Sequence, residues 1–292
     1  VMPTGEVITP TKGTPQGGIL SPLLSNVVLN ELDWWITSQW EAMPTHYPYK
    51  QGTNKQGTTI KSHTYRALRQ SNLKEIYIVR YADDFRIFCR SYNNAKRAFY
   101  AVTGWLQDRL KLSISEEKST ITNLKQKYSE FLGFKLKVKP KGKKYVVSSH
   151  MSDKSLKNAK EKISKCVKAI KRPSNSKEQY KEIIQYNATV SGLHNYYCIA
   201  TNVNLDFAKI AFDIKKQMKN KLDIKTNGII SKGFIKEKYG KSKQLRFLNG
   251  HPLIPVGYVQ TKDAQHKRKS INKYTVEGRQ LIHDNLKIDI DI

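Results

Sequence analysis

The sequence is poor in cysteine, in acidic side chains and in long apolar runs. Its three cysteines, Cys89, Cys166 and Cys198, are odd in number and far apart, which excludes a disulfide-stabilised scaffold. No Cys-x-x-Cys pair occurs and the seven histidines are scattered, so we predict no structural zinc site. No apolar run approaches the ~18 residues of a membrane-spanning helix, and no signal peptide is recognisable, so we expect a reducing, cytoplasmic location.

Basic side chains far outnumber acidic ones. The chain carries 52 Lys and Arg against 24 Asp and Glu, a net charge of +28 over 292 residues. Such an excess repels itself in a compact chain unless a polyanion lies against it, so nucleic acid is the first candidate partner and an anionic membrane surface the second. Hydrophobic residues make up 38% and aromatic residues 10%, enough for the cores of about two domains, which excludes disorder throughout.

The first half mixes helical and strand patterns, which predicts an α+β fold. Residues 20–40 form an apolar, helix-compatible run with Pro22 in its first turn, and residues 94–110 repeat apolar positions every three or four residues. Residues 75–92 place β-branched and aromatic side chains on either side of one acidic pair, the pattern of strand, turn and strand. Residues 45–71 are polar and rich in Gly, Lys and Thr, and we expect an exposed loop or insertion there.

The second half is predicted to be mainly helical after two short strands at 129–139 and 144–149. A first helix is expected from the N-cap Ser152 to a stop at Pro173, and two further amphipathic helices follow it. Three such helices in a row suggest a small helical bundle. The apolar positions expected to face its core are Leu156, Ala159, Ile163, Val167 and Ile170, then Tyr180, Ile183 and Ile184, then Leu205, Ala208, Phe212, Met218 and Leu222.

Asp83 and Asp84 are the residues with the clearest chemical potential. Adjacent carboxylates in a tight turn between two apolar strands would stand on a rigid rim. Mg²⁺ takes carboxylate oxygens and keeps room for water and phosphate, and two such ions about 4 Å apart can stabilise the attacking and leaving oxygens of phosphoryl transfer. The alternative is ordinary turn chemistry with both side chains in solvent. The two residues by themselves leave both interpretations open.

The residues around this pair resemble those of a known family. Residues 81–85, Tyr-Ala-Asp-Asp-Phe, resemble the catalytic hairpin of reverse transcriptases, and residues 12–26 resemble the polymerase motif that precedes it. Together these motifs are similar to the reverse transcriptase/maturase proteins of group II introns. Further segments that resemble the family are residues 112–118, the hairpin motif at 131–134, the thumb or maturase segment at 191–197, and residues 274–283, which lead to the DNA-binding part.

The resemblance implies a partial reverse-transcriptase palm over residues 1–149, an α-helical thumb (maturase domain X) over 150–233, and a basic linker with the start of a DNA-binding region over 234–292. It implies RNA-directed DNA polymerase activity together with splicing of a mobile intron. The family's fingers and first catalytic motif would lie upstream of Val1, so we expect this stretch of chain alone to be inactive. The implied partners are group II intron RNA, an RNA template with a DNA primer, a DNA target and dNTPs, with no membrane partner and a nucleoid-associated location in a bacterial source.

In such an enzyme a primer 3′-hydroxyl attacks the α-phosphate of a dNTP and releases pyrophosphate. The resemblance makes Asp83 and Asp84 the catalytic residues and the ligands of Mg²⁺. The residues that it places at the nucleotide or template are Gln16, Gly17, Gly18, Tyr81, Ala82 and Lys118. The two glycines lack a Cβ and allow another chain to approach, and the glutamine amide can donate and accept hydrogen bonds. The alternatives are an ordinary loop entering a helix and, for Lys118, a solvated lysine.

Basic residues gather between 135 and 178, where the sequence has fourteen lysines and one arginine against three acids. A solvated helix face usually carries charges of both signs, so a face of one sign predicts binding to a phosphate backbone that weakens steeply with salt. The candidate nucleic-acid-binding residues on the first helix are Lys154, Lys157, Lys160, Lys165 and Lys168. Tyr196 and Tyr197 could stack on bases or, at helical spacing, lie in the core.

Two other functions fit parts of the sequence. One is a non-catalytic, RNA-binding splicing factor that retains the palm as a scaffold, which the basic helix fits equally well. The intact acidic pair argues against it, because a scaffold has no physical need for two carboxylates that face a polyanion. The other is a related reverse transcriptase used in defence, or in retrohoming without splicing.

Overall fold

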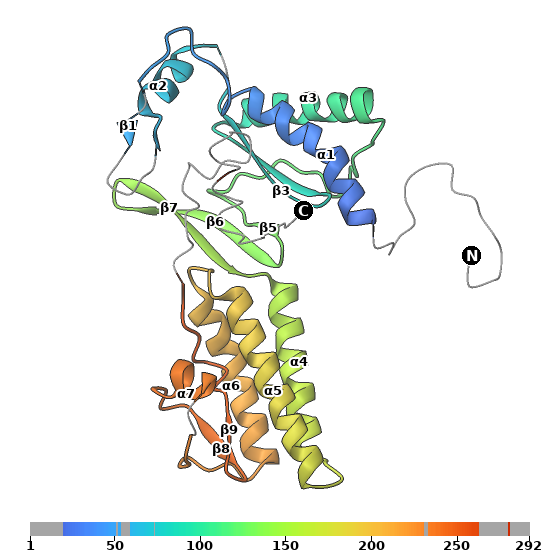
Figure 1. The fold of residues 1–292 in the computed structure, drawn as a ribbon, viewed down its shortest axis with the longest axis vertical. Coiled ribbons are helices and arrows are strands. Elements are labelled where there is room, and N and C mark those ends of the chain that lie inside the picture. The colour runs from blue at the N-terminus through green and yellow to red at the C-terminus, as the bar shows by residue number, and fades with distance from the viewer. Residues whose placement is uncertain are drawn as a thin grey trace, which may run out of the picture. The chain divides into compact units, whose positions relative to one another are not determined.

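The computed structural model describes residues 20–50, 52–53, 59–72, 74–230, 233–262 and 280. These residues form two compact units, one with residue 280 and the described residues up to Ile121, and the other with those from Thr122 to 262. Both units contain helices and strands, so the α+β fold class is confirmed (Figure 1). Within the described residues, no helix is both long and apolar enough to cross a membrane.

In the first unit a β-hairpin packs against two helices. These elements are α1 (Ser21–Ser38), β3 (Ile76–Tyr81), β4 (Asp84–Cys89) and α3 (Tyr92–Leu110) (Figure 1). The antiparallel ladder pairs Ile78 with Ile87, so one face of the hairpin presents isoleucines to the helices. The buried residues of this core are Leu29, Leu32, Ile36, Val102 and Leu106. Both predicted helices and the predicted strand–turn–strand pattern are confirmed.

Short sequence signals mark where helices begin and end. Pro22 lies in the first turn of α1, where its missing N–H costs nothing. Ser91 and Ser152 are N-caps, whose hydroxyl oxygens accept hydrogen bonds from first-turn N–H groups of α3 and of α4 (Asp153–Lys171). Helix α4 ends just before Pro173, as the sequence predicts.

The segment 45–71 is more structured than the sequence suggests. It contains β1 (Gly52–Thr53), β2 (Thr59–Ile60) and helix α2 (Ser62–Gln70). Leu68 of α2 is buried, and Tyr65 stacks on Trp40 with 6.5 Å between the ring centroids. The expectation of an exposed loop was therefore wrong for α2, because a few apolar and aromatic side chains in a polar stretch gave it a buried side.

The second unit joins a three-stranded sheet to a helical bundle. The sheet is antiparallel in the order β5–β6–β7, and helices α4, α5 and α6 share one core. The strands of this sheet are β5 (Ser129–Phe131), β6 (Phe134–Lys141) and β7 (Lys144–Met151). The remaining elements are α5 (Ser176–Tyr197), α6 (Val203–Lys221), α7 (Phe234–Tyr239), β8 (Arg246–Leu248) and β9 (His251–Leu253).

The core confirms the apolar stripe predicted for α4, but for α6 it confirms only Met218 and Leu222 at the end of the predicted stripe. Helix α6 buries Phe207 and Ile210, whereas Leu205 and Phe212 are 59% and 76% exposed. The predicted core positions that the structure exposes are Tyr180, Ile184, Leu205, Ala208 and Phe212. The prediction was wrong because both sides of α6 carry apolar residues, and only packing against the other helices selects one of them.

The compact units do not follow the borders predicted at 149 and 233. Met151 of β7 lies in the same core as the helices, and Phe134 of β6 packs against that core. Residues 234–259 also join this core, where the Tyr186 hydroxyl donates to the Ile254 carbonyl oxygen at 3.0 Å. The β-sheet and the segment after 233 are therefore parts of the helical unit, and the division into palm, thumb and linker stays a prediction.

Candidate active site and nucleic-acid interface

A two-residue turn joins β3 to β4 and carries the acidic pair. Tyr81 pairs with Asp84 in the ladder, so Ala82 and Asp83 form the turn. Ala82 has a φ of 52° whereas Asp83 does not have a positive φ, as in a type II′ hairpin turn. A non-glycine residue in this region costs about 1–3 kcal/mol, and such strain is common at functional sites.

Both carboxylates stand on the open side of the hairpin. Asp83 and Asp84 are exposed, and the Tyr81 side chain is 65% exposed. Because ladder partners share a face, Tyr81 and Asp84 point away from the face that packs on α1 and α3. Neither carboxylate forms an ion pair with a described residue. This exposure fits both a metal ligand and a plain turn, so the assignment of Asp83 and Asp84 as metal ligands stays a prediction.

Arg80 ties the turn to α1. Its Nε and Nη2 donate to the carboxylate oxygens of Asp33 at 2.9 and 2.8 Å. Its Nη1 donates to Asn26 Oδ1 at 2.9 Å and to the Ala82 carbonyl oxygen at 2.7 Å. The Arg80 and Asp33 side chains are 7% and 2% exposed. Sequence reasoning missed these contacts, although an acid inside the apolar run 20–40 and an arginine inside a strand are signals of a buried pair.

The acidic pair fits a hard divalent cation. Mg²⁺ is usually held by one or two carboxylates, with water and substrate phosphates completing its coordination. Asp83 and Asp84 supply two carboxylates, and their exposure leaves space for a triphosphate. Among the described residues, no group of three or more His, Cys, Asp or Glu side chains gathers into a metal site. The turn therefore suits a cation that is shared with a phosphate substrate.

Only part of the predicted nucleotide site comes together in the structure. Tyr81 and Ala82 belong to the acidic turn. Lys118 is exposed in a separate turn, where its N–H donates to the Ser115 carbonyl oxygen at 3.2 Å. Gln16, Gly17 and Gly18 lie outside the described residues. The placement of Lys118 and of the glycine motif at the nucleotide thus stays a prediction.

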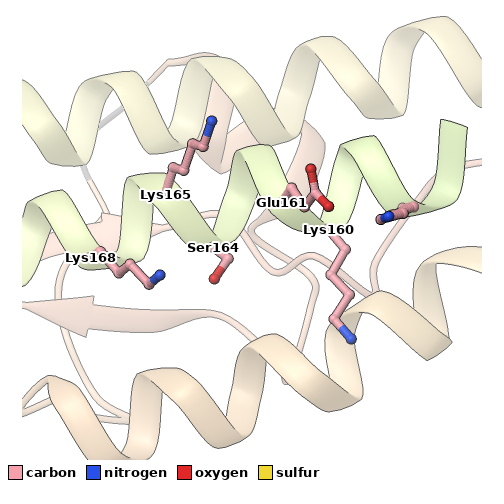
Figure 2. Close-up of a pocket in the computed structure, with 6 residues that line it drawn as sticks. Lys160, Glu161, Ser164, Lys165 and Lys168 are labelled. Atoms are coloured by element: carbon pink, nitrogen blue, oxygen red, sulfur yellow. The ribbon is translucent and has the colours of Figure 1, made fainter. Parts of the chain in front are cut away.

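The lysines of α4 line an open surface of the second unit. Of the five lysines predicted to bind nucleic acid, four are exposed, namely Lys154, Lys157, Lys165 and Lys168. The fifth, Lys160, is half-buried, and its Nζ lies 2.5 Å from Asp213 Oδ2 of α6. A shallow pocket of about 330 Å³ is lined by Lys157, Lys160, Glu161, Ser164, Lys165 and Lys168. Figure 2 shows Lys160, Ser164 and Lys168 on one side of α4, and Glu161 and Lys165 on the other. Four lysines against one acid suit a phosphate group.

The β6–β7 hairpin adds a second basic surface in the same unit. Side chains alternate between the two faces of a strand, so every second residue of β6 shares a face. The lysines on that face are Lys135, Lys137, Lys139 and Lys141, and Lys144 of β7 pairs with Lys141 across the turn. Like charges directly opposite each other are destabilising on their own. Because residues 139–147 are all exposed, the hairpin tip is open to an anionic partner.

Tyr196 and Tyr197 support the turn between β5 and β6. This turn consists of Leu132 and Gly133, with φ of 50° and 77°, as a type I′ turn requires. The Tyr196 hydroxyl donates to the Leu132 carbonyl oxygen at 3.0 Å, and its ring stacks on Phe134 with 5.6 Å between the centroids. Tyr197 is buried in the core. The core interpretation therefore holds for Tyr197, and Tyr196 has a structural role although it is half exposed.

His194, in the segment that resembles the maturase region, is a buried neutral histidine. Its Nε2 donates to the Val256 carbonyl oxygen at 2.9 Å, and the Tyr239 hydroxyl donates to its Nδ1 at 3.1 Å. Burial lowers the pKa of His194 to about 4. Both ring nitrogens are occupied by described residues, so this histidine joins α5 to the segment after residue 233 and does not hold a metal.

One family model and several known proteins are similar to part of this chain. Residues 2–136 match the family model described as Reverse transcriptase (RNA-dependent DNA polymerase). The chain is 33% identical over 152 residues to the COX1/OXI3 intron 2 protein of Saccharomyces cerevisiae, which covers 44% of this chain and 18% of that protein. It is 30% identical over 159 residues to the group II intron-encoded protein LtrA of Lactococcus lactis subsp. cremoris, which covers 44% and 26%. It is 28% identical over 134 residues to protein YkfC of Escherichia coli K12, which covers 43% and 32%.

The match includes the acidic turn and its support. Residues 2–136 contain α1 with Asp33, the strand with Arg80, and both aspartates. The chain spans less than a third of the length of each of these three relatives. These similarities confirm the resemblance to reverse transcriptases and to proteins named as group II intron-encoded, with residues 2–136 as the part that matches the reverse transcriptase model.

Proposed function

We propose that the protein is an RNA-directed DNA polymerase and RNA-splicing maturase of a mobile group II intron. The observation that carries the polymerase activity is the exposed Asp83–Asp84 turn, held in a strained conformation inside the segment that matches reverse transcriptases. Strain at an exposed turn persists only where the surrounding structure holds it, and this pattern is typical of sites that bind a ligand.

The residues of the turn have distinct roles in the proposed reaction. Asp83 and Asp84 would hold Mg²⁺, which when bound neutralises triphosphate charge and favours the 3′-hydroxylate. Their position on an open rim lets the primer end and the dNTP approach from the same side. The exposed ring of Tyr81, which points to the face of Asp84, offers an apolar surface to the nucleotide or template. The 3′-hydroxyl attacks the α-phosphate, and pyrophosphate leaves.

The second unit would bind the nucleic acids. The exposed lysines of α4 and those at the tip of the β6–β7 hairpin form two basic surfaces on one compact unit. Phosphate contacts position a nucleic acid without reading its sequence, so such surfaces suit intron RNA, the RNA template with its DNA primer, and a DNA target alike. We therefore assign the helical bundle the role of the thumb and maturase domain.

Replacing Asp83 tests the polymerase activity. Asp83→Asn in the full-length protein removes one ligand charge and keeps the size of the side chain, so we expect primer extension on an RNA template to fall by at least about 100-fold. RNA affinity should stay unchanged, because the basic surfaces lie in the other unit. Asp108→Asn, at an exposed acid of α3, is the matched control and should extend primers normally.

Primer-extension and splicing assays on the same full-length protein distinguish the proposed function from the two other functions that fit the sequence. Normal extension by Asp83→Asn would contradict the catalytic assignment. A wild-type protein that promotes intron splicing but synthesises no DNA with Mg²⁺ would instead favour the non-catalytic splicing factor. A protein that synthesises DNA but does not promote splicing would favour the reverse transcriptase that acts without splicing.

A further inference from the structure

Arg80 uses its guanidinium group in two directions at once. One edge forms a bidentate pair with the Asp33 carboxylate on α1, and Nη1 reaches the Asn26 amide oxygen and the Ala82 carbonyl oxygen. Arginine is suited to this task because its donors are fixed in one plane. A single rigid group thus connects the helix to the turn that carries the acidic pair.

Stability alone does not explain this buried pair. Removing two charges from water costs several kcal/mol per ion, and well-packed apolar side chains in their place are often neutral or stabilising. Position 80 lies in the row of Ile76 and Ile78, which packs on the core, so an apolar side chain there would simply extend that row. Such a side chain has no donor for the Ala82 carbonyl oxygen.

The Ala82 carbonyl group lies at the point that sets the position of Asp83. It belongs to the planar peptide that joins Ala82 to Asp83, so a hydrogen bond to its oxygen restrains the orientation of the backbone from which the Asp83 side chain leaves. Alanine adopts a left-handed φ of this kind at a cost of roughly 1–2 kcal/mol, and the turn would relax if nothing held it.

We propose that Arg80, fixed by Asp33 and Asn26, is a positioning residue that holds the Ala82–Asp83 peptide so that the carboxylates of Asp83 and Asp84 stay arranged for a divalent cation. Arg80 and Asp33 are buried, with side chains 7% and 2% exposed, so they would act on the cation through the turn and not by direct contact. This inference rests on the proposed function, in which the acidic pair holds Mg²⁺. In this arrangement Asp33, the buried acid of α1, supports the reaction indirectly. It fixes Arg80, and Arg80 in turn holds the backbone of the turn.

Mn²⁺ binding, measured by electron paramagnetic resonance per folded protein, tests the proposal without depending on catalysis. Arg80→Lys keeps the positive charge but removes the planar guanidinium group that donates in several directions. Asp33→Asn keeps the size of the side chain but removes the negative charge that pairs with Arg80. We expect both variants to bind Mn²⁺ about 10–100-fold more weakly, the usual effect of losing a residue that orients a metal ligand. The Mg²⁺ concentration for half-maximal DNA synthesis should rise in parallel, with the KM for template–primer unchanged.

Glu31→Gln is the matched control. Glu31 also lies on α1 and pairs with an arginine, Arg109, at 2.9 Å, but both side chains are at least half exposed. This variant should keep wild-type Mn²⁺ affinity and the wild-type Mg²⁺ requirement. An equal loss in Glu31→Gln would mean that any change in the charge of α1 disturbs the metal, which would overturn the specific role of Arg80.

A second substitution keeps the test decisive if the first two variants are less stable. Ala82→Gly removes the Cβ that makes the positive φ costly, so the turn then depends less on Arg80. In the Arg80→Lys background we expect Ala82→Gly to restore part of the Mn²⁺ affinity. A merely structural role predicts a lower melting temperature, unchanged Mn²⁺ affinity of the folded protein and no rescue, and that result would overturn the proposal.

Asp83→Asn shows whether the proposed function or only the positioning role of Arg80 has failed. If Asp83→Asn keeps DNA synthesis, the proposed function fails and the positioning role fails with it. If Asp83→Asn abolishes synthesis while Arg80→Lys and Asp33→Asn keep the wild-type metal affinity and requirement, only the positioning role is wrong.

Discussion

The Tyr196 hydroxyl of α5 donates a hydrogen bond to the backbone carbonyl oxygen of Leu132, 3.0 Å away. Leu132, like Ala82 in the acidic turn, is a non-glycine residue with a positive φ in a two-residue hairpin turn. In both turns the carbonyl oxygen of this residue accepts a hydrogen bond from a side chain, Tyr196 in one and Arg80 in the other. The two compact units therefore hold a strained turn in the same way.

Removing the Tyr196 hydroxyl should loosen the Leu132 turn. We expect Tyr196→Phe to lower the stability of the second unit by about 0.5–1.5 kcal/mol, the net value of one hydrogen bond. Amide hydrogen exchange of α5 measures this change. Tyr180→Phe, the same substitution at a half-exposed position of the same helix, is the control. Equal effects of the two substitutions would show that the bond to Leu132 adds nothing.

Gly133→Ala should be more damaging than the loss of that hydrogen bond. A Cβ at position 133 would lie 2.8 Å from Ser155 Oγ and 3.1 Å from the Tyr197 hydroxyl, and the φ of 77° is itself unfavourable for alanine. We expect a loss of more than about 1.5 kcal/mol, because the close contact adds to the backbone cost, and the same hydrogen exchange of α5 measures it. Gly142→Ala, at φ 58° but with no atom within 4 Å of its Cβ, isolates the backbone cost from the clash. A loss no larger than that of Gly142→Ala would rule out the close contact.

The face that α6 buries can be checked with two phenylalanines. Phe207 is fully buried and Phe212 is 76% exposed. We expect Phe207→Ala to destabilise the second unit by about 3–5 kcal/mol and Phe212→Ala to change it by no more than about 0.5 kcal/mol. Hydrogen exchange of α6 measures the stability of the second unit. All four tryptophans lie in the first unit, so their fluorescence should show that this unit unfolds as in the wild-type protein. A larger loss of stability for Phe212→Ala than for Phe207→Ala would show that α6 buries the face predicted from the sequence.

Acid should destabilise the second unit through His194. Its folded pKa of about 4 lies below the ordinary 6.5, so the unfolded chain binds the extra proton first as the pH falls. The stability contributed by the neutral ring is complete above about pH 6.5 and is lost as the pH falls toward 4, by at most about 1.4 kcal/mol per pH unit. His194→Gln should lower stability at pH 7 but remove this part of the pH dependence, as measured by hydrogen exchange of α5. An unchanged acid dependence in the variant would contradict this account.

The basic helix should contribute to the salt dependence of RNA binding. Lys157→Gln, Lys165→Gln and Lys168→Gln together remove three exposed charges of the α4 pocket. If each neutralises a phosphate, the slope of log affinity against log salt should flatten by about 0.7–0.9 per lysine. The control removes the same net charge from the exposed lysines Lys236, Lys241 and Lys243. A slope that changes equally in both triple variants would show only an effect of net charge.

Local signals in the sequence determined much of the scaffold. The caps Ser91 and Ser152 and the stop at Pro173 act within one helical turn, so they can be read without knowing the fold. The strand–turn–strand pattern around Asp83 and Asp84 is equally local, because it depends on side-chain alternation and a two-residue turn. For the same reason the reverse transcriptase motif could be recognised from a few contiguous residues.

Only the tertiary structure decided which apolar face of α6 is buried, that residues 234–259 complete the helical core, and that Arg80 meets Asp33. Arg80 and Asp33 are 47 positions apart, and no pattern within either segment names the other. Burial of an apolar face or of a charge is settled by what lies against it, since desolvation is favourable for one and costly for the other unless a partner is present. Those partners come from distant parts of the chain, and folding alone brings them together.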